Sequence, residues 1–315
     1  MQTRKLGKTD LEIVPLIFGG NVFGWTIGEA RSFEILDALV DRGLNCIDTA
    51  DVYSAWVPGN QGGESETILG KWLARSGKRD KVVLLTKVGN KMPGGEGLSK
   101  KWIVEEVENS LKRLQTDRID LYQSHKDDAG TPLEETLGAY AQLIEQGKVR
   151  FVGASNYTGA RLAGAIELAE EKKLPVYKTL QPEYNLHARQ AYEQDLAPVA
   201  AKYGLGVIPY FSLASGFLTG KYQSVEEAKE AKRVSLVTKY FDERGLKILK
   251  ALKQVSEETG AEQAAISLAW LLAQPTITAP IASATSTGQL EALVAAVELK
   301  LSEAQVKALT DASAY

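Results

Sequence analysis

Cysteine and histidine are scarce in this sequence. Its 315 residues include one Cys and 2 His. A single Cys cannot form an internal disulfide, which excludes a disulfide-stapled secreted fold. Two His are too few for a His-rich binuclear metal centre, although they would suffice for a site of one His and carboxylates. We predict no bound metal.

Strong charge of one sign and long apolar runs are also missing. The 37 Lys+Arg and 40 Asp+Glu give a net charge of −3 without a basic block, which excludes the electrostatic footprint of a nucleic-acid binder. No apolar run approaches the roughly 18–20 residues that span a bilayer. Residues 1–7 carry charge without the apolar core of a signal peptide. We therefore expect a cytoplasmic protein without nucleic-acid or membrane partners.

What the sequence does contain is an alternation of short apolar runs and amphipathic segments, repeated about every 30–40 residues. Such an alternation is typical of βαβ units around a parallel sheet. The predicted strands cover residues 15–18, 44–49, 81–87, 119–125, 149–155, 179–182, 206–210 and 277–282.

Amphipathic helices are predicted between these strands. In residues 99–114, Ile103, Val107 and Leu111 recur at a spacing of four and form one helical face. Residues 133–144 repeat the pattern. Eight strands, each followed by a helix, predict an α/β fold of the (β/α)8 TIM barrel type. An open doubly wound sheet is the competing arrangement.

Two segments interrupt the alternation. Residues 4–14 contain a turn-like stretch and predict an N-terminal β-hairpin that closes the bottom of the barrel. Residues 211–239 form a long polar segment after the seventh strand, and loops of this length are usually functional. We expect residues 1–315 to form a single domain.

Four polar residues lie at or just after the ends of three consecutive predicted strands. Asp48 lies at the end of the second strand and Tyr53 shortly after it, Lys87 ends the third strand and His125 ends the fourth. Reactive residues of such barrels gather at the carboxyl ends of the strands, so we expect these four to face one cavity.

This set of side chains suits proton transfer to a carbonyl oxygen. An ammonium favours the phenolate, so we expect Lys87 to lower the pKa of Tyr53 from about 10. Tyr53 is then the general acid. Asp48 is the counter-ion of Lys87, and His125 orients the carbonyl oxygen by a hydrogen bond. An isolated pair of this kind is more often structural, so the prediction depends on all four occurring together.

The motifs that contain these residues resemble those of the aldo-keto reductases, in the family's order and over nearly the whole chain. Residues 6–11 and 212–222 resemble the bacterial branch, which is itself similar to the β subunits of voltage-gated potassium channels. The remaining matching motifs are residues 48–53, 84–87, 120–125, 153–156 and 181–185.

The resemblance implies a barrel that binds NADP(H) in an extended form and transfers hydride to a carbonyl carbon while Tyr53 protonates the oxygen. In agreement, no Gly-x-Gly-x-x-Gly motif follows any predicted strand. The residues implied to contact the cofactor are Ser155, Asn156 and Gln181 at the carboxamide, Tyr210 stacked on the nicotinamide ring, and Ser212, Leu213, Gly216 and Lys221 along the pyrophosphate.

The chain departs from the family after the eighth strand. Ser283, Thr285 and Gln289 occupy positions where relatives often place Lys or Arg against the adenosine 2′-phosphate. Hydroxyl and amide groups can contact a phosphate without supplying charge. We therefore expect NADP(H) to be bound with a weakened preference, and NAD(H) to be used as well.

The loop after the second strand is longer than in compact relatives. Trp56 from this loop, with Phe23 and Trp25 from the first loop, is predicted to wall an apolar substrate pocket. The alternative, to which we give equal weight, is that Trp56 packs under its own loop.

Three functions compete at this point. The first is a reductase of small carbonyl compounds, and the second is a slow or non-catalytic nicotinamide-nucleotide-binding module. The third is a barrel lyase that uses Lys87 as a Schiff base, for which a lysine paired with Asp48 is poorly suited. The sequence leaves oligomerisation open.

Overall fold

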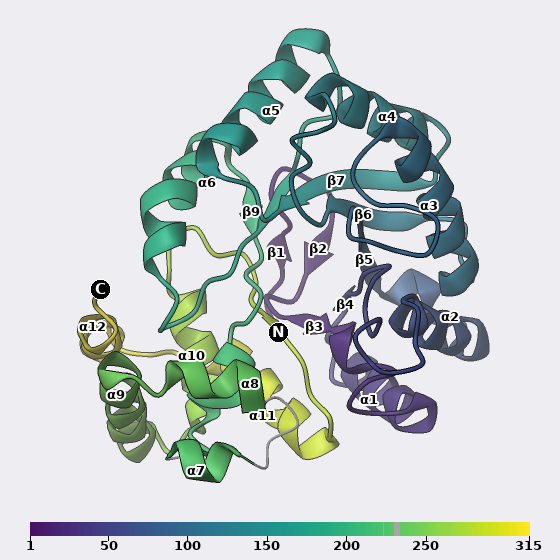
Figure 1. Cartoon of the computed structure of the whole chain (residues 1–315). Helices are drawn as coiled ribbons and strands as arrows, with labels where there is room; N and C mark the ends of the chain where they lie inside the picture. The colour runs from purple at the N-terminus through teal and green to yellow at the C-terminus, as the bar shows by residue number, and fades with distance from the viewer. Residues whose placement is uncertain (223, 230–233) are drawn as a thin grey trace.

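The computed structural model describes residues 1–222, 224–229 and 234–315. An eight-stranded parallel sheet with the order β10-β3-β4-β5-β6-β7-β8-β9 occupies its centre, and the helices lie outside it (Figure 1). The barrel strands are β3 (Ile17–Gly19), β4 (Cys46–Asp48), β5 (Val83–Val88), β6 (Ile119–Ser124), β7 (Val149–Ser155), β8 (Thr179–Gln181), β9 (Gly206–Val207) and β10 (Ile281–Ala282).

The two end strands of this order meet and close the sheet. Val207 pairs with Ile277 in a parallel bridge, and Ile281 N donates to Pro209 O at 2.9 Å. The predicted (β/α)8 barrel is therefore confirmed over the open doubly wound arrangement. The strands β9 and β10 are shorter than predicted because Pro209 and Pro280 have no N–H to donate to a ladder.

The predicted helices are present. In α3, Ile103, Val107 and Leu114 are buried, and the Ser99 hydroxyl caps the helix by accepting from Trp102 N. The helices are α1 (Glu29–Asp41), α2 (Glu64–Ser76), α3 (Lys100–Leu114), α4 (Leu133–Glu145), α5 (Gly159–Lys172), α6 (Ala197–Tyr203), α7 (Val225–Ala228), α8 (Val234–Val237), α9 (Glu243–Thr259), α10 (Gln263–Leu272), α11 (Thr287–Glu298) and α12 (Glu303–Ala312).

The N-terminal hairpin closes one end of the barrel, as predicted. Its strands, β1 (Arg4–Lys5) and β2 (Glu12–Ile13), pair antiparallel. Leu6, Leu11 and Ile13 are buried and pack in one cluster with side chains of the barrel strands. Apolar burial therefore holds the hairpin against the ends of the strands.

Glycine is required at the turn of this hairpin. Gly7 has a φ of +61°, and a Cβ at this position would lie 2.3 Å from Lys178 O. Only a residue without a side chain fits so close to the neighbouring backbone.

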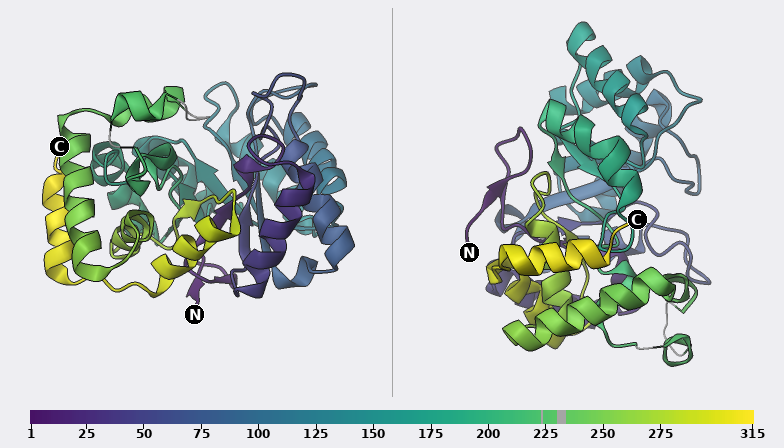
Figure 2. Two further views of the ribbon diagram at one scale, coloured as in Figure 1. Left: turned by 90° about the horizontal axis from the view of Figure 1, so that it is seen from below. Right: turned by 90° about the vertical axis from the view of Figure 1, so that its left-hand side faces the viewer.

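The segment 211–239 contains short helices rather than irregular loop alone. They are α7, α8 and a 3₁₀ segment at Ala214–Thr219, and residues 223 and 230–233 lie outside the described part. The right-hand view of Figure 2 shows α7 and the N-terminal hairpin at opposite ends of the barrel. Among the described residues, no helix is long and apolar enough to cross a membrane.

Candidate active site

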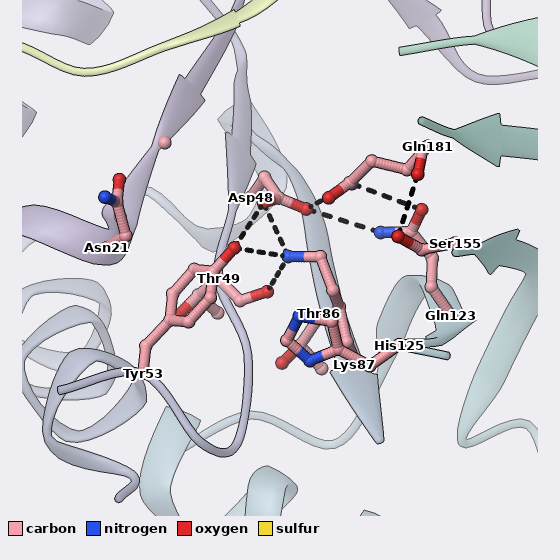
Figure 3. A network of polar contacts seen from close by, with 12 residues as sticks. Asn21, Asp48, Thr49, Tyr53, Thr86, Lys87, Gln123, His125, Ser155 and Gln181 are labelled. Atoms are coloured by element: carbon pink, nitrogen blue, oxygen red, sulfur yellow. Dashed lines mark hydrogen bonds and ion pairs between the residues drawn. The ribbon is translucent and has the colours of Figure 1, made fainter. Parts of the chain in front are cut away.

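The four predicted catalytic residues meet at one end of the barrel. Asp48 ends β4, Lys87 lies near the end of β5, and His125 directly follows β6. These three strands are neighbours in the sheet, with Asp48 opposite Leu85 and Lys87 opposite Gln123. Tyr53 lies in the loop after β4 and turns its phenol toward Lys87 (Figure 3).

The Lys87 ammonium is the centre of this cluster. Its Nζ donates to Asp48 Oδ2 at 2.6 Å, to Thr49 O at 2.7 Å and to Tyr53 Oη at 2.9 Å. The three acceptors match the three donors of an ammonium. The side chains of Lys87 and Asp48 are 0% and 1% exposed, so water does not screen this pair.

The direction of the Tyr53 pKa differs from our expectation. Burial and the Asp48 carboxylate raise the pKa of the Tyr53 phenol well above 10, while burial lowers the pKa of the Lys87 amine. The expected net lowering was wrong because the sequence does not show how far burial removes the phenol from water, which disfavours the phenolate. Tyr53 therefore keeps its proton at neutral pH.

The His125 imidazole is neutral. Burial, and then the Lys87 charge, lower the pKa of His125 well below 6.5. Its Nδ1 atom is buried without a hydrogen-bond partner among the described residues. A buried N–H without an acceptor is unfavourable, so we assign the proton to Nε2. The imidazole centroid lies 5.9 Å from that of the Tyr53 ring, which places both groups beside one space.

Two glutamine amides bind the other oxygen of Asp48. Gln181 Nε2 donates to Asp48 Oδ1 at 3.1 Å, and Gln123 Nε2 donates to the same atom at 3.3 Å. Sequence reasoning missed Gln123. Residues two apart in a strand point the same way, so the inward-facing Leu121 and His125 would have indicated that Gln123 also points inward.

The residues predicted at the nicotinamide carboxamide lie next to this cluster. Asn156 Nδ2 donates to His125 O at 2.8 Å, and Ser155 Oγ donates to Gln181 O at 2.8 Å. Tyr210 Oη donates to Asn156 Oδ1 at 2.8 Å. The structure thus brings these four predicted residues together beside His125.

The residues predicted at the pyrophosphate follow Tyr210 directly. The Ser212 hydroxyl is buried and donates to Pro209 O at 3.0 Å, so it is already used within the chain. Leu213 O accepts from Gly216 N at 2.8 Å. A Cβ on Gly216 would lie 3.5 Å from Lys221 Nζ, so the ammonium lies close to the half-buried backbone at Gly216.

Ser215 was missed by sequence reasoning. Its φ is +57°, and its Oγ is buried without a partner among the described residues. A hydroxyl without a partner, on the residue before Gly216 and in the segment that carries Lys221, fits an anionic group. Nothing in the sequence distinguishes this serine from Ser212.

Of the three residues predicted at the adenosine end, Ser283 bonds to the end of β3, whereas Thr285 and Gln289 bond to each other. Ser283 Oγ lies 2.7 Å from Gly19 O, and Gln289 Oε1 accepts from Thr285 N at 2.8 Å. The Ser286 hydroxyl caps α11 by accepting from Gln289 N, so a helix begins within this segment. Arg31 Nε donates to Thr285 O at 3.4 Å. Sequence reasoning missed this arginine because α1 lies far from α11 in the chain.

Two tryptophans form an aromatic wall beside the phenol. The rings of Trp25 and Trp56 meet edge to face at 5.3 Å, and Trp56 lies 6.1 Å from the Tyr53 ring. Trp56 is 48% exposed, so it does not pack under its own loop. The expectation for Phe23 was wrong, because Phe23 is fully buried and stacks on Phe18 in the core.

Comparison with known proteins confirms the resemblance. The sequence profile described as the Aldo/keto reductase family matches residues 15–314. The uncharacterized oxidoreductase YrpG of Bacillus subtilis is 38% identical over 320 residues, which cover 99% of this chain and 95% of the relative. A probable voltage-gated potassium channel subunit beta of Arabidopsis thaliana is 33% identical, over 95% of this chain and 92% of the relative. The L-glyceraldehyde 3-phosphate reductase of Escherichia coli is 32% identical, over 94% and 88%.

Proposed function

The chain belongs to the aldo/keto reductase family of oxidoreductases, and on that premise we propose that it reduces small aldehydes or ketones to alcohols with a nicotinamide cofactor. The observation that carries this proposal is the position of Lys87 Nζ, 2.9 Å from Tyr53 Oη and 2.6 Å from Asp48 Oδ2. This arrangement gives a phenol that can release a proton beside a charge that stabilises the phenolate.

The residues present fit a nicotinamide dinucleotide. Ser155 and Asn156 offer donors and acceptors near His125, and the unpartnered Ser215 hydroxyl lies in the segment that carries Lys221. The cofactor supplies, when bound, the hydride that reduces the carbonyl carbon. We propose NADP(H) as this cofactor and NAD(H) as a second one.

The chain's own residues handle the carbonyl oxygen. The Nε2–H of His125 donates a hydrogen bond to that oxygen and fixes its orientation. Tyr53 transfers its proton to the oxygen as negative charge develops there. The high pKa of Tyr53 does not prevent this step, because the alkoxide that forms is about as basic as hydroxide and takes a proton readily.

Lys87 and Asp48 balance the charge that this transfer leaves behind. The phenolate of Tyr53 forms 2.9 Å from the Lys87 ammonium, in a site where burial strengthens their attraction. Asp48 keeps the ammonium charged before and after the step. The protonated Lys87 amine donates to three acceptors and has no lone pair with which to attack a carbonyl carbon. This disfavours the formation of a Schiff base at Lys87.

The substrate class follows from the wall of the site. The edge-to-face pair of Trp25 and Trp56 suits an apolar or aromatic group on the carbonyl compound. We also propose the cytoplasm as the compartment, which agrees with the lone Cys46, buried in the barrel.

A second candidate function is a slow nicotinamide-nucleotide-binding module. The similarity to a probable potassium channel subunit beta supports it, since that protein is named for a channel and not for a reaction.

Single-turnover oxidation of NADPH bound to the protein separates the two functions. We expect an activated aromatic aldehyde to oxidise one equivalent of NADPH and to yield the alcohol, identified by chromatography. NADPH that binds but is not oxidised would leave only the binding module.

A further inference from the structure

We propose that Ser54 is a positioning residue that holds the Tyr53 phenol against Lys87, an inference that rests on the role of Tyr53 proposed above. Ser54 directly follows Tyr53 and is fully buried. Its φ is +74°, in the left-handed region that favours glycine and that side chains rarely adopt. Such backbone conformations persist only where surrounding contacts enforce them.

Two hydrogen bonds hold Ser54 in this conformation, and a third joins the same two loops beside it. Ser54 Oγ donates to Phe23 O at 2.7 Å. Asn60 Nδ2 donates to Ser54 O at 3.1 Å and to Gly24 O at 3.2 Å. Together they tie the loop after β4 to the loop after β3.

These two loops carry the groups that surround the reacting carbonyl. Tyr53 and Trp56 come from the loop after β4, and Trp25 comes from the loop after β3. The bond from Ser54 to Phe23 therefore sets the direction in which the chain leaves Tyr53, and with it the distance between the phenol and Lys87.

The choice of serine over glycine supports this role. Glycine would adopt a φ of +74° without strain, but it has no hydroxyl to bond Phe23 O. The chain thus keeps an unfavourable backbone conformation at the residue next to the proposed acid, together with a hydroxyl that ties this residue directly to the neighbouring loop.

The first test compares Ser54→Gly with Lys173→Gly. Lys173 also has a positive φ, +55°, but it is exposed at the end of α5. Both changes relieve backbone strain, whereas only Ser54→Gly removes the bond between the loops. We expect Ser54→Gly to lower kcat for aldehyde reduction about 10- to 100-fold, with KM and the Kd for NADPH within about twofold of the wild type.

The control variant and the Tm distinguish a positioning role of Ser54 from a role in stability alone. Lys173→Gly should leave kcat unchanged. If Ser54 served only the stability of the fold, relief of strain would leave Ser54→Gly as active as the wild type below its Tm. That result would overturn the proposal, whichever way the Tm moves.

A second measurement does not depend on activity. Tyrosine labelled with ¹³C at Cζ reports the ionisation of each phenol by NMR, and Tyr53→Phe identifies the Tyr53 signal. In the wild type, Tyr53 should remain protonated well above pH 10, because burial and Asp48 raise its pKa. In Ser54→Gly the titration midpoint should fall toward the ordinary value of about 10.

The outcomes distinguish this proposal from the proposed function. An unchanged Tyr53 signal in Ser54→Gly contradicts the role of Ser54, even if the protein is an active reductase. A changed signal in a protein that reduces no aldehyde keeps the positioning role and removes the reductase.

Discussion

At the scale of single residues, the charge balance of the site depends on Lys87 and Asp48. Lys87→Met removes the only charge that compensates the buried Asp48 carboxylate within hydrogen-bond distance among the described residues. We expect this change to lower the free energy of unfolding by about 3–5 kcal/mol, because it leaves an uncompensated buried charge. Urea denaturation followed by circular dichroism measures the difference.

The double variant Lys87→Met, Asp48→Leu is the matched comparison. It leaves no unpaired charge, so much of the lost stability should return while reduction stays abolished. If the double variant were less stable than Lys87→Met alone, the account of this buried pair would be wrong.

The titration of Tyr53 and His125 predicts a flat pH profile. The pKa of Tyr53 is raised in the folded protein, so its contribution to stability is complete below about pH 10 and declines above it, while the phenol keeps its proton until the pH reaches the raised pKa. The pKa of His125 is lowered, so the imidazole stays neutral through 6.5. We expect kcat/KM for reduction to be constant between about pH 6 and 9. A loss of activity below a midpoint near 6.5 would show instead that the state of His125 changes within this range.

What sequence reasoning supplied at this scale was the set of residues that we propose as catalytic. Polar side chains at the ends of neighbouring strands must face one end of a barrel, which made Asp48, Lys87 and His125 predictable. The direction of the Tyr53 pKa was not, because burial depends on how the loops cover the phenol. Ser54 was also out of reach, since neither its φ nor its bond to a distant loop shows in the sequence.

At the scale of elements, the segment from β10 to the start of α11 decides between the two cofactors. Ser283, Thr285 and Gln289 carry no positive charge, and Arg31, which contacts Thr285, also pairs with Glu34. We therefore expect less than a hundredfold preference for NADPH over NADH in the dissociation constants measured by fluorescence titration.

Gln289→Arg tests the same segment by a gain of affinity. A guanidinium here should bind the 2′-phosphate and tighten NADPH about tenfold while leaving NADH unchanged. A wild-type preference above a hundredfold would show that another residue already supplies this charge.

The elements themselves were largely predictable. The apolar run at Val149–Ser155 was assigned as a strand with the bounds that β7 has in the structure. The predicted strands were too long at β9 and β10, where proline interrupts the ladder. The short helices α7 and α8 were missed because four residues are too few for a helical period to be recognised.

At the scale of the whole molecule, the buried cluster that contains Leu6, Leu11 and Ile13 packs the N-terminal hairpin against the strands that carry the site. Leu6 is fully buried inside the end of the barrel, and we propose that the chain unfolds as one domain. Leu6→Ala should lower the free energy of unfolding by about 2–5 kcal/mol in one urea transition, seen alike by fluorescence and circular dichroism. Leu246→Ala, at a side chain 50% exposed on α9, is the control and should have little effect. Two separate transitions would contradict a single domain.

The central claim is that the Tyr53 phenol protonates the carbonyl oxygen beside Lys87, and a single-turnover rate tests it most directly. Tyr53→Phe removes one oxygen, and Tyr203→Phe removes the same atom on the outer helix α6, where the hydroxyl donates to Glu167. We expect Tyr53→Phe to slow aldehyde-dependent oxidation of bound NADPH by about 10²- to 10⁴-fold, and Tyr203→Phe to match the wild type. Equal rates in all three proteins would contradict the account.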